Sequence, residues 1–77
     1  MHQPMPEEVL YYVTVRDGGR TGFLLGPYLS RAEALANVER GKNLAATANG
    51  YAWFYAYGTA SYPARRPVRV VFPDAPP

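Results

Sequence analysis

Hydrophobic and polar residues alternate along the first third of the chain in a pattern that predicts two strands. Residues 9–16 are rich in β-branched and aromatic side chains, which favour extended backbone. Residues 21–28 have a similar composition and end in Gly-Pro-Tyr. Between them, residues 17–20 contain the Asp-Gly and Gly-Gly pairs that supply the positive φ angles of a tight turn. This part of the chain therefore predicts a β-hairpin.

The pattern then changes to three- and four-residue spacing, which predicts a helix from Ser30 to about Ala48. Ser30 and Glu33 have the spacing of a capping box, in which each side chain bonds to the backbone amide of the other residue. Leu29 is placed to pack against Ala34 as a hydrophobic staple. These local signals fix where the helix begins.

The helix carries a narrow apolar stripe that we expect to face the sheet. Gly41 lies on this stripe, although glycine costs about 1 kcal/mol relative to alanine inside a helix. We therefore expect the helix backbone to come close to the sheet at Gly41, and a break of the helix at this glycine is the alternative. The other residues of the stripe are Ala34, Leu35, Val38, Ala45 and Ala48.

Residues 50–60 alternate large rings with small residues and predict a third strand. Successive side chains of a strand point to opposite faces of the sheet. One face then carries Tyr51, Trp53, Tyr55 and Tyr57, and the other carries Ala52, Phe54 and Ala56. We expect the helix to pack on the face with the two alanines and the four rings to face outward. The reverse orientation is the alternative.

These elements predict an α+β fold, in which a small antiparallel sheet of three or four strands has one helix packed on one face. Their order is β-β-α-β. Residues 68–72 predict the short fourth strand, and we place it at an edge because prolines flank it. We expect a single domain over residues 8–72, a flexible arm at 1–7 and a flexible tail at 73–77.

The composition bears on how the core is stabilised and on where the protein is expected to be located. The chain of 77 residues has no cysteine, so neither a disulfide nor a thiolate metal site supports its core. No apolar run approaches the roughly 20 residues of a membrane span. The N-terminus has neither the basic start nor the apolar stretch of a signal peptide. We therefore expect a cytoplasmic protein that does not act at a membrane.

Residues suited to catalysis are few. The single histidine, His2, lies in the N-terminal arm. Glu33 and Asp17 are accounted for by the capping box and the turn. Glu7 and Glu8 are adjacent, so in a strand they point to opposite faces and do not converge on a metal. We therefore expect a protein that is not an enzyme and that has no cofactor or metal site.

The row of four rings indicates a binding surface instead. A ring-rich sheet face is larger than the apolar patches that monomers usually expose, and tyrosine and tryptophan dominate the energetics of protein interfaces. We expect this face to be covered by a second copy of the chain in a homodimer or higher oligomer, by a host protein, or by the chain's own C-terminal strand. The leading hypothesis is an accessory protein that acts by protein–protein interaction.

Single-stranded nucleic acid is the alternative ligand. Residues 49–56 are similar to the RNP1 strand of RNA-recognition motifs in the Gly-Tyr-Ala-Trp run at 50–53. The rings would stack on bases, and Arg65, Arg66 and Arg69 would contact phosphates. Two observations place this hypothesis second. The order of elements differs from that motif, and a net charge of +2 is small for a phosphate binder.

Two wider resemblances add expectations of origin and role. The run Gly-Pro-Tyr-Leu-Ser-Arg-Ala-Glu-Ala at 26–34 resembles the start of SPOR domains, which implies binding of peptidoglycan glycan. Residues 11–28, 34–41 and 54–60 together resemble small proteins of actinobacteria and their bacteriophages. That resemblance implies an accessory protein encoded by a phage or prophage, which modulates or inhibits a host factor and has no catalytic residues.

Overall fold

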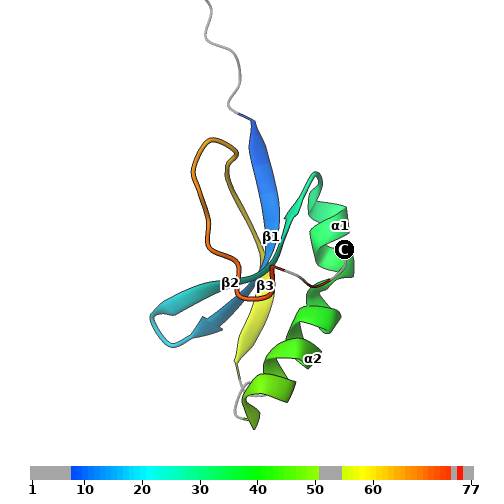
Figure 1. The fold of residues 1–77 in the computed structure, drawn as a ribbon, viewed down its shortest axis with the longest axis vertical. Coiled ribbons are helices and arrows are strands. Elements are labelled where there is room, and N and C mark those ends of the chain that lie inside the picture. The colour runs from blue at the N-terminus through cyan, green and yellow to red at the C-terminus, as the bar shows by residue number, and fades with distance from the viewer. Residues whose placement is uncertain (1–7, 51–54, 74, 76–77) are drawn as a thin grey trace, which may run out of the picture.

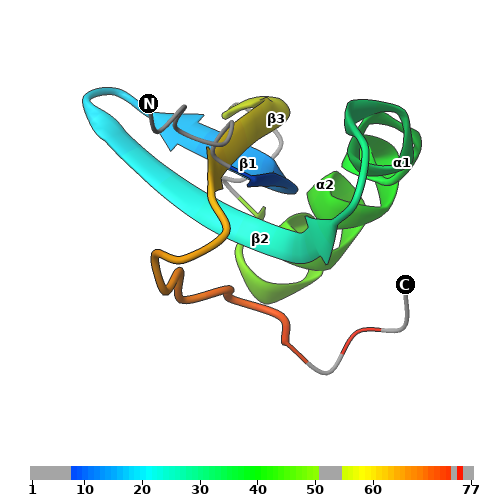
Figure 2. The same cartoon turned by 90° about the horizontal axis from the view of Figure 1, so that it is seen from above.

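The computed structural model describes residues 8–50, 55–73 and 75. Two layers make up the fold, a three-stranded antiparallel sheet and a pair of helices that pack on one face of it (Figures 1 and 2). The α+β fold class is therefore confirmed. The elements in chain order are β1 (Val9–Asp17), β2 (Arg20–Tyr28), α1 (Arg31–Ala36), α2 (Val38–Ala48) and β3 (Ala56–Pro63).

The sheet has the strand order β2-β1-β3, so the central strand is the first one in the chain. The predicted hairpin is confirmed, with a turn in which Gly18 has a φ of 61°. Val13, near the middle of β1, is fully buried and lies opposite Leu25 of β2 and Thr59 of β3. The core therefore centres on β1, below the helices.

A β-bulge in β2 directs two consecutive leucines to the same face. Val13 pairs with Leu25 and Thr14 pairs with Phe23, which leaves Leu24 as the extra residue. In a regular strand Leu24 and Leu25 would point to opposite faces. Both are buried, and both have a Cδ1 atom within 3.6 Å of a Cβ placed on Gly41 of α2. The bulge thus adds an apolar side chain to the layer between sheet and helices.

The single helix expected from Ser30 to Ala48 is interrupted at Asn37. Ser30 Oγ accepts a hydrogen bond from the amide of Glu33 at 3.1 Å, which confirms this bond of the capping box. The side-chain amide of Asn37 donates to the carbonyl oxygen of Glu33 at 2.8 Å. The backbone N–H of Asn37 donates to the carbonyl oxygen of Ala34 at 3.0 Å. Asparagine competes in this way with the regular helical bonds, so the helix divides here and not at Gly41.

Gly41 makes the close approach that its place on the stripe predicts. It is buried, and a Cβ placed on it would lie only 2.8 Å from Cγ1 of Val13. The strand that Gly41 approaches is not the expected one, because we expected the helix to pack over Ala52 and Ala56 of the third strand. Ala56 is exposed, and the helix meets the central strand instead. Ala52 lies outside the described residues.

Two predictions about apolar residues near α1 are wrong. Leu29 is 78% exposed, so it does not staple against Ala34, which is completely buried. Leu35 is 63% exposed although we assigned it to the buried stripe. The residue that packs in its place is Leu44 of α2, which contacts the core alongside Val38. The short α1 buries only Ala34, and so Leu35, the next residue, points away.

The third strand begins later than the aromatic pattern predicts. Residues 51–54 lie outside the described residues, and β3 begins at Ala56 and continues to Pro63. Residues 61–63, which lie beyond the predicted end of this strand, pair with the start of β1, where Leu10 lies opposite Tyr62 and Val9 opposite Pro63. A proline is tolerated here because it ends an edge strand.

The C-terminal segment runs along the outer edge of β2. Val70 forms a single parallel bridge with Phe23, and the backbone amides of Val71 and Phe72 donate to the carbonyl oxygens of Phe23 and Leu24 at 2.8 and 3.1 Å. In Figure 2 this segment, in orange and red, turns around β2. The predicted fourth strand is thus a single bridge, and it lies at an edge as expected.

Candidate functional site

The structure describes two of the four rings of the predicted binding row, Tyr55 and Tyr57. Tyr51 and Trp53 lie outside the described residues. Tyr55 is half-buried in a bend before β3, where its hydroxyl oxygen accepts from Nδ2 of Asn49 at 3.4 Å. Tyr57 packs against the hydrophobic core below the helices. The outward orientation expected for Tyr57 is therefore wrong, because pairing with β1 puts it opposite Val15, on the helix face of the sheet.

The environment of Tyr57 favours its neutral form. Burial raises the pKa of the Tyr57 phenol above its ordinary value of 10.0, and the nearby Tyr55 raises this pKa further. Desolvation disfavours a phenolate, and a second phenolate nearby would repel it. Tyr57 is thus a neutral packing residue near physiological pH.

Another set of rings occupies the face of the sheet that points away from the helices, which we call the back face. Tyr12 meets Phe23 edge to face with centroids 5.3 Å apart, and Phe23 meets Tyr62 in the same way at 5.2 Å. Tyr12 is buried, whereas Tyr62 remains 39% exposed. This cluster joins all three strands. The sequence signals Tyr12 only as a position that alternates with Tyr11 and Val13, and nothing local connects it to Tyr62.

Two of the candidate arginines lie far from Tyr57. Arg65 and Arg66 are exposed in the turn that follows β3, whereas Tyr57 is near the opposite end of this strand. At about 3.3 Å per residue, the strand from Tyr57 to the turn is about 20 Å long. Arg69 is exposed next to the Val70 bridge, on the β2 side of the sheet. The three arginines therefore do not form one cluster with Tyr57.

The outer edge of β3 is bare in the part of the chain that the structure describes. β3 pairs with β1 on one side, and no described residue pairs with it on the other. Both helices cross the helix face of the sheet and contact all three strands, so they do not cap this edge (Figure 2). The eight residues of β3 carry no charged side chain. Such an edge presents unpaired N–H and C=O groups to any added strand.

The middle of this edge strand is built from small residues. They are Gly58, Thr59, Ala60 and Ser61. A Cβ placed on Gly58 would meet no described atom within 4 Å, so the space above this glycine is open. An incoming strand could therefore approach β3 closely along its centre.

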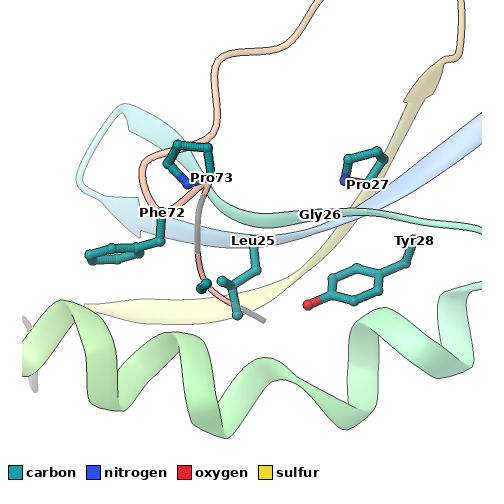
Figure 3. Close-up of a pocket in the computed structure, with 7 residues that line it drawn as sticks. Leu25, Gly26, Pro27, Tyr28, Phe72 and Pro73 are labelled. Carbon is teal, nitrogen blue, oxygen red and sulfur yellow. The ribbon is translucent and has the colours of Figure 1, made fainter. Parts of the chain in front are cut away.

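A small pocket lies between β2 and the C-terminal segment (Figure 3). Its volume is about 200 Å³, which is below the roughly 300–1,000 Å³ of most ligand sites. Tyr28 is 6% exposed, its hydroxyl points into the pocket, and no described residue hydrogen-bonds to it. The other residues that line it are Leu25, Gly26, Pro27, Phe72, Pro73 and Ala75. A pocket of this size holds one ring at most.

Other site types are scarce within the described ranges. They contain no group of three or more metal-ligating side chains, and no helix among them has the length and apolarity needed to cross a bilayer. One buried polar atom there, Nη2 of Arg40 on α2, has no hydrogen-bond partner, while Nη1 of the same side chain donates to Asn37 Oδ1 at 3.3 Å. The outer edge of β3 therefore remains a candidate binding surface among the described residues.

No protein-family model, curated protein or solved structure matches this chain. The residues and geometry of the described sheet therefore carry the functional proposal.

Proposed function

We propose that this protein has no catalytic role and acts by binding another protein through the outer edge of β3. The observation that carries the proposal is an eight-residue edge strand without a charged side chain. Folded proteins commonly protect such edges with lysine, proline, a bulge or a covering segment. An edge that has none of these along its centre is suited to receive a strand from a partner, which adds main-chain hydrogen bonds to the sheet.

An exposed ring on β3 itself supports the same proposal. Tyr62 is 39% exposed, and a tyrosine side chain adds contact area when a partner covers it. On the resemblance to small proteins of actinobacteria and their bacteriophages, we further propose that the partner is a second copy or a host protein in a bacterial cytoplasm.

Single-stranded nucleic acid receives less support as the ligand. A stacking platform needs rings and cationic side chains along one groove. Tyr57 packs in the core. Arg65 and Arg66 lie in the turn beyond the other end of β3, and Arg69 lies on the β2 side of the sheet.

The test is to charge the edge without disturbing the fold. Ala56→Lys and Ser61→Lys change two exposed residues of β3, and together they should block strand addition, because lysines on an edge hinder pairing. The matched control, Ala32→Lys with Ala48→Lys, adds the same charge at exposed helical positions. Native mass spectrometry and affinity capture from bacterial lysate would compare both with the unchanged chain.

We expect the unchanged chain and the helical control to self-associate or to retain a specific protein, and the edge variant to lose that binding. The proposal is wrong if no protein partner of either kind is found, or if the edge variant binds as well as the helical control.

A further inference from the structure

We infer that Asn49 is a modification site, where the side-chain amide is lost without an enzyme and the residue becomes aspartate or isoaspartate. The observation that carries this inference is the Asn49-Gly50 pair, which is exposed and follows the last residue of α2. The inference goes beyond the proposed function, because it concerns the covalent chemistry of the chain and requires no binding partner.

The reaction uses only the backbone and water. The backbone nitrogen of Gly50 bonds to Cγ of Asn49 and loses its proton, while the bond from Cγ to Nδ2 breaks and Nδ2 leaves as ammonia. The product is a cyclic succinimide. Water then adds to one of the ring carbonyl carbons and breaks its bond to nitrogen. Opening at Cγ gives aspartate, whereas opening at the main-chain carbonyl carbon gives isoaspartate, in which the chain continues through Cγ.

Gly50 makes the nucleophilic nitrogen accessible. A side chain on the residue after an asparagine obstructs ring closure, and glycine has none. Gly50 is exposed, and a Cβ placed on it would meet no described atom within 4 Å. The ψ angle of Asn49 is 113°, so the ring closes only after rotation about this bond. No described residue accepts a hydrogen bond from the Gly50 amide, and so no such bond opposes the rotation.

The other two asparagines of the chain lack this combination. Asn37 is followed by the β-branched Val38, and its side-chain amide donates to the carbonyl oxygen of Glu33 at 2.8 Å. Asn43 lies inside α2 and is followed by Leu44. In a helix interior the next backbone N–H is held by the bond to the carbonyl four residues earlier, so its nitrogen does not reach the side chain. These two residues are therefore internal controls.

The modification changes the C-terminal end of α2. The new carboxylate places a negative charge where the helix dipole is already negative, which is unfavourable. It also replaces Nδ2, which donates to the hydroxyl oxygen of Tyr55 at 3.4 Å, by an oxygen that cannot donate. Isoaspartate further adds one atom to the backbone between α2 and β3. We therefore expect the modified chain to unfold at a lower urea concentration than the unmodified chain.

The test is to incubate the full chain for several weeks at physiological temperature and neutral pH. Peptide mass mapping detects the mass gain from amide to carboxylic acid at each asparagine, and isoaspartate is separated from aspartate by chromatography. We expect Asn49 to react several-fold faster than Asn37 or Asn43 and to give both products. Gly50→Ala should slow the reaction at Asn49 several-fold. It should leave the fold intact, because the φ angle of Gly50 is not positive.

Circular dichroism checks that this variant is folded, and ion exchange separates the modified chain for urea denaturation. Equal rates at the three asparagines, or an unchanged rate in Gly50→Ala, would overturn the inference. An Asn49 that keeps its amide throughout the incubation would overturn it as well. Equal urea midpoints for the modified and unmodified chains would contradict the effect on α2.

Discussion

The two outer edges of the sheet differ in whether another described segment of the chain pairs with them. Along β2, the C-terminal segment contributes the Val70 bridge and two backbone hydrogen bonds, and Phe72 packs against the core. Along β3, no described residue does the same. A sheet with two bare edges can add strands without end, whereas a sheet with one bare edge closes as a pair. The difference therefore limits association through strand pairing to two copies.

The largest expected effect comes from removing the protection of β2. A chain that ends at Pro67 loses the hydrogen bonds of Val71 and Phe72 and the apolar contacts of the Phe72 ring. We expect the free energy of unfolding to fall by about 2–4 kcal/mol. With both edges bare, the chain should also form assemblies larger than a dimer. Urea denaturation and sedimentation velocity measure the two effects.

Phe72→Ala separates packing from edge protection in this experiment, because it removes the ring and leaves the backbone bonds in place. It should lower stability without producing the larger assemblies. If the shortened chain is as stable and as small as the full chain, the C-terminal segment does not protect β2.

Gly41→Ala should destabilise the fold through the central strand β1 without affecting either edge of the sheet selectively. The added Cβ would lie 2.8 Å from Cγ1 of Val13, whose β-branched side chain is fully buried and stiff. Overpacking of this kind costs about 1–3 kcal/mol, and the better helix propensity of alanine returns up to about 1 kcal/mol. We expect a net loss of about 1 kcal/mol in urea denaturation, with the association of folded molecules unchanged. A gain in stability would show that the helix does not approach β1 this closely.

A charge at Ala60 should distinguish the bare edge from the protected one. Ala60 lies at the centre of β3, and Ala60→Lys should weaken the binding of a protein partner by about 0.5–1 kcal/mol, because a lysine on an edge strand hinders pairing. The same change at Val71, which is exposed beside β2, should have no effect on this binding. Equal binding by the two variants in affinity capture or native mass spectrometry would contradict the proposed edge.

The smallest expected effect is a pH dependence that originates at the start of β3. Because the pKa of Tyr57 is raised in the folded state, the unfolded chain loses this proton at a lower pH than the folded chain does. The stabilisation is complete below about pH 10 and is lost as the pH rises through the folded pKa. Urea denaturation at about pH 8 and about pH 11 should show a steeper loss for the natural chain than for Tyr57→Phe. Equal losses would mean that other groups cause the dependence.

Local signals predicted those parts of the fold that local interactions determine. The Asp-Gly-Gly turn defines the hairpin, and the Ser30 cap defines the start of α1. The close approach of the helix to the sheet at Gly41 could also be predicted, because a glycine on an apolar stripe has few explanations other than close packing. The break at Asn37 was missed because asparagine is only mildly unfavourable in a helix, and the bond from its side chain to Glu33 is a detail of one rotamer.

The position of β3 and its bare edge depend on contacts between distant residues. Alternation predicts a strand but cannot tell whether residue 57 or residue 58 faces the core. Pairing settles the choice, since Tyr57 lies opposite Val15 and Thr59 opposite Val13. The cluster of Tyr12, Phe23 and Tyr62 joins residues from three strands, so no single stretch of sequence carries its signal. The outward orientation predicted for Tyr57 was wrong for the same reason.

The bulge in β2 also has a consequence for insertions and deletions. Leu24 has no opposite residue on β1, and without it the pairs on either side, Thr14 with Phe23 and Val13 with Leu25, would follow each other directly. The second register shift, between Val13 and Tyr11, would remain. A chain shortened by Leu24 would therefore keep its turn and the faces of its other side chains, and would lose only the volume of one leucine beneath α2. This position is where the hairpin can change in length by one residue while its pattern of partners stays the same.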